Sequence, residues 1–200
     1  MGTKDAEPRD VLYRIKRGLA GYVSYLAACE MNEAFSEYVL YEPILRILTA
    51  RNYTVECEYE CPGVVQPAKG DKKRIDFRAV RPSIELAIEV KWLQSAKAKL
   101  ESDLEKLHGF ATERPNSIPL LVVFGKQSHL SKFAPIAWDL MERGSPVIAQ
   151  FGTTRYCCRI FELKATCPCG KGQSAVTQRS NDWGRVGERW ESTAAPAPPS

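Results

Sequence analysis

The chain has 200 residues, 44% of them apolar, and a formal net charge of +4 at pH 7. This length and composition suffice for one hydrophobic core, and the mild charge permits a polyanionic partner without requiring one. No run of about 18 apolar residues occurs and the N-terminus is polar, so we expect neither a membrane span nor a secretory signal. Seven irregularly spaced cysteines indicate reduced thiols in a cytoplasmic protein.

Two helices are predicted in the first 52 residues. Residues 10–30 carry apolar side chains at helical spacing, and Asp10 is placed to cap the first turn. Residues 32–52 carry a second stripe that includes Leu40, Ile44 and Leu48. Pro43 either kinks this helix or starts a new first turn.

The rest of the chain alternates between strand and helix patterns. Alternating or unbroken apolar runs predict strands in five segments: 53–60, the hairpin 74–92, 119–125, 146–152 and 155–163. Helical stripes predict helices over 95–110, capped by Ser95 and ended by Gly109, and over 131–144. Residues 61–73 form a loop with a basic tip.

This element order predicts an α/β fold with a mixed β-sheet flanked by helices. We expect a flexible N-terminus over 1–10, a single domain over 11–165 and a disordered tail over 166–200. A zinc site is disfavoured, because the C-x-C spacing in the tail is not the usual knuckle. The thiols considered for it are Cys157, Cys158, Cys167 and Cys169.

The hairpin over 74–92 separates apolar from charged residues by a period of two. The face expected to be buried carries Ile75, Phe77, Ala79, Ile84, Leu86, Ile88, Val90 and Trp92. The opposite face carries Arg74, Asp76, Arg78, Glu85, Glu89 and Lys91. The register of the hairpin decides which of these charges meet.

A two-residue loop of Arg81 and Pro82 would set Arg74 opposite Glu89 and make an ordinary salt-bridged surface. Tight hairpin turns favour positive φ at these positions, and proline is fixed near −65°, so this register is disfavoured. A small α/β interaction domain, whose hairpin charges are incidental, would need it.

A four-residue loop over 81–84 instead pairs Val80 with Glu85 and sets Asp76 opposite Glu89. Like charges directly opposite each other destabilise a hairpin. A divalent cation between the two carboxylates would remove that cost, so the preferred register predicts a metal site.

Asp76, followed on the next strand by Glu89 and Lys91, resembles the signature of the PD-(D/E)XK nuclease superfamily. Ile75 stands where that family often has proline. The order helix, three strands, helix, strand over residues 33–125 is similar to the restriction-endonuclease-like core of that family, α-β-β-β-α-β. The stretch "SDLEKL" looks like the helices that cover the site in that family.

The resemblance implies a nuclease in which Asp76 and Glu89 hold Mg²⁺, with Mn²⁺ as a substitute, and Lys91 lies beside the attacking water. Phosphodiester hydrolysis by in-line attack of a metal-activated water is the implied reaction. Family members often add an acidic residue from the first core helix. Glu37 lies on the sheet-facing side of the helical wheel and Glu42 on the solvent side, so Glu37 is the better candidate.

The partner implied is nucleic acid, with DNA favoured over RNA, and a homodimer is permitted. Basic residues near the motif suit phosphate contacts, but a solvated basic loop accounts for them equally well. They are Lys69, Lys72, Lys73, Arg74, Lys97 and Lys99. A second hypothesis is a nucleic-acid-binding or scaffolding protein that keeps the fold without cleavage. No P-loop, dinucleotide fingerprint or G-x-S-x-G motif supports another enzyme class.

Overall fold

The computed structural model describes residues 6–31, 36–95, 99–134 and 139–164. The chain divides into two compact units, Met1–Thr166 and Cys167–Ser200. The second unit, with Cys167, Cys169 and the tail expected to be disordered, lies outside the described residues. So does Lys97.

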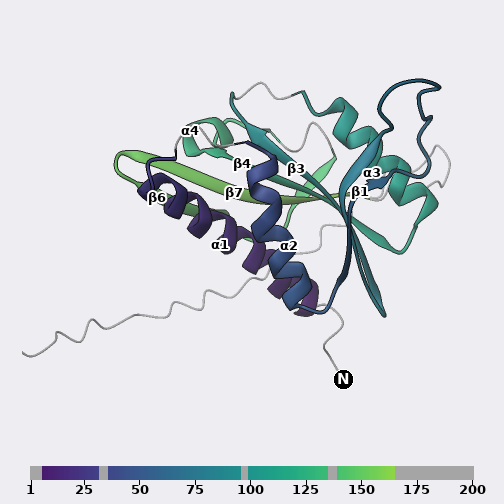
Figure 1. The fold of residues 1–200 in the computed structure, drawn as a ribbon, viewed down its shortest axis with the longest axis horizontal. Helices are drawn as coiled ribbons and strands as arrows, with labels where there is room; N and C mark the ends of the chain where they lie inside the picture. The colour runs from purple at the N-terminus through teal and green to yellow at the C-terminus, as the bar shows by residue number, and fades with distance from the viewer. Residues whose placement is uncertain (1–5, 32–35, 96–98, 135–138, 165–200) are drawn as a thin grey trace, which may run out of the picture. The chain divides into compact units, whose positions relative to one another are not determined.

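The first unit is an α/β structure with a mixed, open sheet flanked by helices (Figure 1). The helices are α1 (Ala6–Ala28), η2 (Tyr38–Leu40), α2 (Tyr41–Ala50), α3 (Glu101–Glu113) and α4 (Gln127–Leu130). The strands are β1 (Thr54–Glu60), β2 (Arg74–Arg81), β3 (Ile84–Leu93), β4 (Ser117–Lys126), β5 (Leu140–Glu142), β6 (Val147–Phe151) and β7 (Thr154–Leu163).

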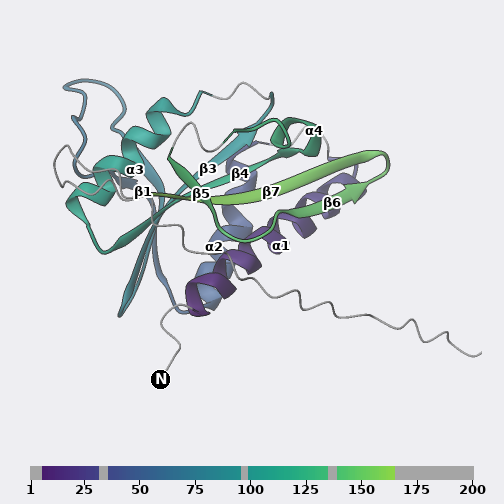
Figure 2. The same cartoon turned by 180° about the vertical axis from the view of Figure 1, so that it is seen from behind.

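The described sheet has seven strands in the order β1-β2-β3-β4-β7-β5, with β6 also paired to β7. Only β3 and β4 are parallel, and α3 makes the crossover between them. The two short strands β5 and β6 follow one another along the same strand, β7 (Figure 2). From η2 to β4 the elements follow the expected order of helix, three strands, helix and strand.

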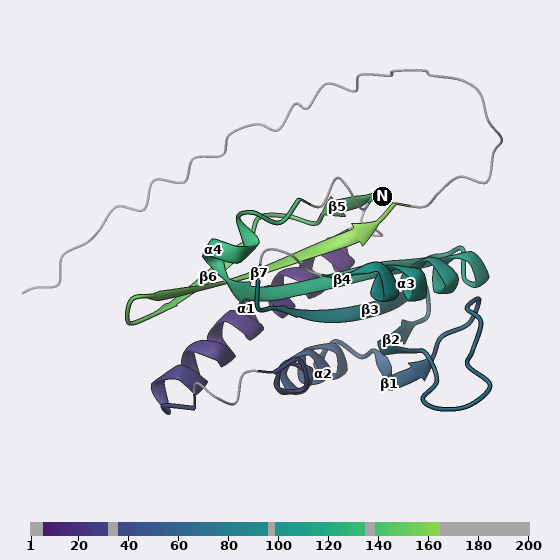
Figure 3. The same cartoon turned by 90° about the horizontal axis from the view of Figure 1, so that it is seen from above.

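Two hydrophobic cores lie on opposite faces of the sheet (Figure 3). The first, which we call the α1/α2 core, contains Ile15, Leu19, Ile44, Leu48 and Phe124. The second, the α3 core, contains Leu104, Leu107, Phe110, Leu121 and Phe161. Successive residues of β4 contribute to alternate cores, which explains why this strand is an unbroken apolar run.

The β2–β3 hairpin has the register expected from the sequence. Val80 pairs with Glu85, so Arg74 does not face Glu89. The alternative of a small interaction domain with incidental hairpin charges required Arg74 to face Glu89, and this register does not provide that pair. Arg81 and Ile84 also pair, which shortens the loop to Pro82 and Ser83. Neither loop residue has a positive φ, and proline suits the second position of such a turn.

The expected apolar face of the hairpin is wrong at one position. Phe77 and Ala79 lie in the α1/α2 core, but Ile75 lies in the α3 core. Alternate residues of a regular strand share a face, so β2 turns over at Asp76. The neighbouring strand does the same: Val55 packs on the α1/α2 core and Tyr59 on the α3 core.

The expected helix over 131–144 is also wrong. Residues 140–142 form β5 against β7, and residues 135–138 lie outside the described part of the chain. Short apolar runs fit either element, and here the free edge of β7 supplies backbone partners for a strand.

Helix boundaries differ from expectation at three places. α1 begins at Ala6, so Asp10 lies inside it and pairs with Arg14 and Arg51. α3 begins at Glu101, after Ser95 and Lys99. It continues past Gly109, whose missing side chain leaves room for the loop after β1: a Cβ there would lie 2.5 Å from Val64 Cγ1.

Pro43 stands in the first turn of α2, which follows η2 as a restarted helix. Cys157 and Cys158 are buried in β7, on opposite faces of the sheet. Among the described residues, no helix is long and apolar enough to cross a membrane.

Candidate active site at the open end of the hairpin

Asp76 lies where β2 and β3 separate. The ladder between the two strands stops at Phe77 and Ile88, so Asp76 and Glu89 come next without forming a ladder pair. The Val90 N–H donates a hydrogen bond of 2.6 Å to Asp76 Oδ2, and the Tyr41 hydroxyl donates to Oδ1. The Asp76 side chain therefore takes the place of a backbone acceptor at the end of the hairpin.

Burial raises the pKa of Asp76 above its ordinary value, although the hydrogen bonds from Tyr41 and Val90 oppose the shift. The Tyr41 hydroxyl also lies 3.5 Å from Glu58 Oε1. Burial and the hydrogen bond to Asp76 raise the pKa of Tyr41, so this hydroxyl remains a donor at neutral pH. Glu58 has a φ of 52°, a left-handed conformation that costs energy for a residue other than glycine.

Glu89 is 2% exposed, and one oxygen of its carboxylate lacks a hydrogen-bond partner. Its Oε2 accepts a hydrogen bond of 2.5 Å from the Lys106 ammonium, while Oε1 is buried without a hydrogen-bond partner. Burial raises the pKa of Glu89 well above its ordinary value. The negative charge of Asp76 adds to the shift, and Lys106 opposes it.

Lys91 forms its ion pairs with two other acids. Its Nζ lies 3.3 Å from Glu37 Oε1 and 3.4 Å from Asp103 Oδ2. Burial lowers the pKa of Lys91, but the charges of Asp103 and Glu37 outweigh it and the pKa is raised overall. Lys91 is therefore an ammonium at neutral pH.

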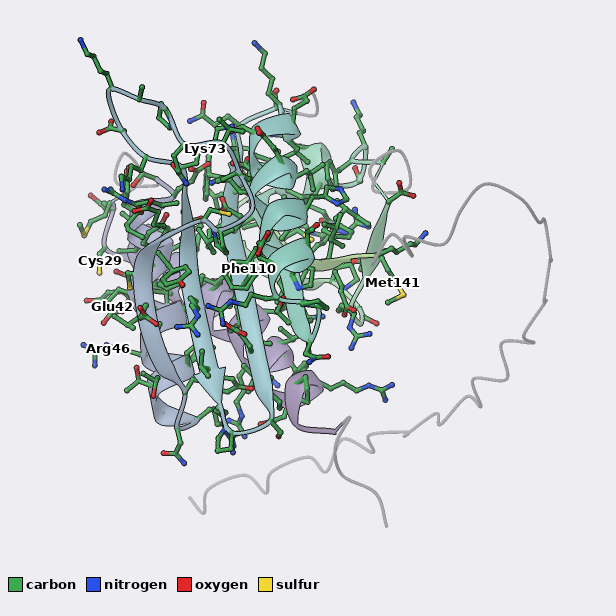
Figure 4. All side chains as sticks on the ribbon, turned by 90° about the vertical axis from the view of Figure 1, so that its right-hand side faces the viewer. Cys29, Glu42, Arg46, Lys73, Phe110 and Met141 are labelled. Carbon is green, nitrogen blue, oxygen red and sulfur yellow. The ribbon has the colours of Figure 1, made fainter. Side chains whose placement is uncertain are left out.

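Glu37 and Glu42 lie on different sides of their helical segment. Glu37 precedes η2, contacts Lys91, and accepts a hydrogen bond of 3.1 Å from the Trp92 N–H. Glu42 forms an exposed pair with Arg46 on the outside of α2 (Figure 4). The structure thus brings Glu37, and not Glu42, to Lys91.

Three residues that the sequence did not single out individually make contacts at the site. Asp103 lies between the two lysines, 3.4 Å from Lys91 and 3.5 Å from Lys106. Lys106 contacts Glu89, and Tyr41 contacts Asp76. The stretch "SDLEKL" was expected to lie over the site, and its helical spacing puts Asp103 and Lys106 one turn apart. Nothing in the local pattern marked Tyr41.

We call the assembled group the carboxylate–lysine cluster. It consists of Glu37, Asp76, Glu89, Lys91, Asp103 and Lys106. Four carboxylates accompany two ammonium groups, so the cluster has an excess of two formal negative charges when all are ionised. Burial makes this excess unfavourable, consistent with the raised pKa values of Asp76 and Glu89.

The basic residues expected to contact phosphate are partly occupied by acidic neighbours. Lys72 pairs with Glu60, and Lys73, at the base of the loop after β1 (Figure 4), pairs with Glu105. Arg74 lies opposite Glu60 in the β1–β2 ladder. Lys69 and Lys99 are exposed.

The chemistry of the cluster fits a hard divalent cation. Carboxylate oxygens are the ligands that Mg²⁺ prefers, and Glu89 Oε1 is a buried oxygen without a partner. In the described ranges, no group of three or more His, Cys, Asp or Glu side chains is arranged to hold a metal ion. Mg²⁺ commonly takes only one or two carboxylates and completes its shell with water and phosphate, so a two-carboxylate site suits it.

No protein-family model, curated protein or solved structure matches the chain.

Proposed function

We propose that the protein is a metal-dependent nuclease that hydrolyses phosphodiester bonds, with DNA as the favoured substrate. The observation that carries the proposal is the Glu89 carboxylate, which is 2% exposed, has one oxygen without a partner, and has its pKa raised by burial and by the charge of Asp76. A buried carboxylate with one unpaired oxygen is unfavourable, and a divalent cation would supply the partner that Oε1 lacks.

Asp76 and Glu89 would hold the ion, Mg²⁺ or Mn²⁺. When bound, it would act as a Lewis acid on a phosphate oxygen and lower the pKa of a water molecule. Its two positive charges match the two-charge excess of the carboxylate–lysine cluster. The hydrogen bonds from Tyr41 and Val90 fix the direction of the Asp76 carboxylate independently of the ion.

Lys91 would act on the substrate as a cation. Because Glu37 and Asp103 keep its ammonium protonated, it suits stabilisation of negative charge on the phosphate and does not suit removal of a proton from water. Glu37 is a positioning residue in this proposal, since it contacts Lys91 and the backbone of Trp92.

The order of elements, the Asp76, Glu89 and Lys91 pattern, and the separation of β2 and β3 at this point support a restriction-endonuclease-like fold of the PD-(D/E)XK superfamily. The alternative is a nucleic-acid-binding or scaffolding protein that does not cut. The Lys106–Glu89 pair favours it, because this lysine already neutralises part of the site.

The test is incubation of the purified protein with supercoiled plasmid, linear duplex, single-stranded DNA and RNA, with Mg²⁺ and with EDTA. We expect cleavage of DNA that requires Mg²⁺ and is lost in Asp76→Asn and Glu89→Gln. Glu42→Gln, which changes an exposed carboxylate in the first turn of α2, is the matched control and should cut like the unchanged protein.

Failure to cut any substrate while DNA binding persists would favour the non-cleaving alternative. Cleavage that survives Asp76→Asn would place the activity elsewhere.

A further inference from the structure

Lys106, on α3, is the lysine that contacts the carboxylate pair. Its ammonium lies 2.5 Å from Glu89 Oε2, and its charge also lowers the pKa of Asp76. Lys91, the lysine of the sequence motif, contacts Glu37 and Asp103 instead. The side chain of Lys106 is 13% exposed, so its charge is held in a largely dry environment.

We propose that Lys106 is a built-in counter-cation, which neutralises the Asp76–Glu89 pair when no divalent ion is bound and must leave when one binds. Lys106 thereby sets the affinity of the site for its metal. This inference rests on the metal-dependent function proposed above.

The reason is electrostatic. An ammonium and a divalent ion at the same buried carboxylate repel each other strongly where the surroundings are poorly polarisable. Once Glu89 is ionised it needs a cation, because an uncompensated buried charge costs several kcal/mol. One cation must therefore replace the other.

The structure provides Lys106 with another partner. Asp103 Oδ1 lies 3.5 Å from its ammonium, one helical turn earlier on α3. A small movement of the four-carbon side chain would transfer the ammonium from Glu89 to Asp103. Both charges then remain paired after the divalent ion binds.

This competition has a measurable size. The apparent dissociation constant rises as the fraction of molecules with a free pair falls. If Lys106 occupies the pair in about nine-tenths of the molecules, removing it should strengthen metal binding about tenfold.

The first measurement is calorimetric titration of the full chain with Mn²⁺. Lys106→Gln should bind Mn²⁺ about tenfold or more tightly than the unchanged protein. Lys132→Gln, which removes an exposed lysine, should bind it equally, and Asp76→Asn should not bind it.

The second measurement uses the unchanged protein, so it does not depend on the folding of a variant. Lysine acetylation is followed by mass spectrometry with and without saturating Mn²⁺. Labelling of Lys106 should rise several-fold with Mn²⁺. Lys16 is the buried reference: it is 3% exposed and donates to the backbone oxygens of Arg143 and Ser145, so its labelling should not change.

Equal or weaker Mn²⁺ binding by Lys106→Gln would overturn the inference, as would unchanged Lys106 labelling at saturating Mn²⁺. If Lys106→Gln binds Mn²⁺ more tightly but the unchanged protein does not cleave DNA, this inference stands and the nuclease proposal falls. If neither the unchanged protein nor Lys106→Gln binds Mn²⁺ in a way that depends on Asp76, both the inference and the nuclease proposal are overturned.

Discussion

The two ends of the β2–β3 hairpin use the same kinds of residue to opposite effect. At the turn end, Arg78 lies between Glu85, at 2.7 Å, and Glu56, so each charge meets its opposite. At the open end, Asp76 and Glu89 gather with two further carboxylates around two lysines, and one oxygen of Glu89 has no partner. The charge pattern along the strands is similar, and the neighbours differ.

The difference shows what separates a structural charge network from a candidate site. The turn end is complete as it stands, because β1 supplies Glu56 and the hairpin supplies Glu85. The open end is incomplete, and burial makes its excess negative charge unfavourable. Substitutions at the turn end should therefore change stability, and those at the open end should change activity.

The largest expected effect is on cleavage by Lys91→Ala. Loss of the ammonium should lower the cleavage rate about 10²-fold or more, because the ammonium would stabilise the negative charge that develops on the phosphate during the reaction. Binding of duplex DNA and Mn²⁺ should remain. Arg78→Ala, at the turn end of the same hairpin, should cleave at the unchanged rate. Gel-based cleavage measures the rate, and fluorescence anisotropy measures DNA binding. If Lys91→Ala binds DNA more weakly but cuts the bound DNA at the unchanged rate, Lys91 is only a phosphate contact.

The next largest effect is on stability, and it concerns the packing of α3, the helix that carries Asp103 and Lys106. A Cβ at Gly109 would meet Val64 Cγ1 at 2.5 Å and the Gly63 backbone at 3.1 Å. Gly109→Ala should therefore lower the free energy of unfolding by about 1–2 kcal/mol, after allowing for the better helix propensity of alanine.

Gly21→Ala is the matched control in α1, where nothing lies within 4 Å of the new Cβ. It should stabilise the protein by about 0.5–1 kcal/mol. Urea unfolding measures both. Equal effects of the two substitutions would mean that the contact between α3 and the loop after β1 does not hold α3 in place.

A smaller effect is expected in the pH dependence of stability. The pKa of Glu89 is raised by burial and by Asp76, from an ordinary value of 4.5. The unfolded chain therefore releases this proton at lower pH than the folded one, and stability falls as pH rises from about 4.5 through the folded pKa.

Glu89→Gln removes this titratable group. The stability of the variant should therefore fall less than that of the unchanged protein between pH 5 and pH 8. The unfolding free energies of both proteins, measured by urea titration across that range, give the difference. A constant difference at all pH values would mean that Glu89 is ionised as easily in the folded chain as in the unfolded one.

The smallest effect is expected for Tyr41→Phe. The Tyr41 hydroxyl donates to Asp76 and lowers its pKa, so removal should raise the pKa of Asp76 further. The acidic limb of the pH–rate profile should move to higher pH, with a loss of only a few-fold at the plateau. Tyr38→Phe, an exposed neighbour on η2, should leave the profile unmoved.

The hairpin illustrates how far a local pattern reaches. Its register was predicted correctly, although the loop has two residues, Pro82 and Ser83, in place of the expected four. Its apolar residues were assigned to the correct face everywhere except at Ile75. The exception arises because β1 and β2 turn over together, and that twist depends on two strands and both cores. The same applies to β5, which is a strand because β7 offers it an edge.

The sequence by itself determined the α/β class, the element order as far as β4, the hairpin register, and the candidates Asp76, Glu89 and Lys91, with Glu37 favoured over Glu42. These follow from periodicity and turn chemistry, which act between residues close in the chain. Only the tertiary structure decided which lysine meets which carboxylate. It brought Lys106 to Glu89 and turned Lys91 toward Glu37 and Asp103, because these contacts depend on how α3 and the segment before α2 pack against β3.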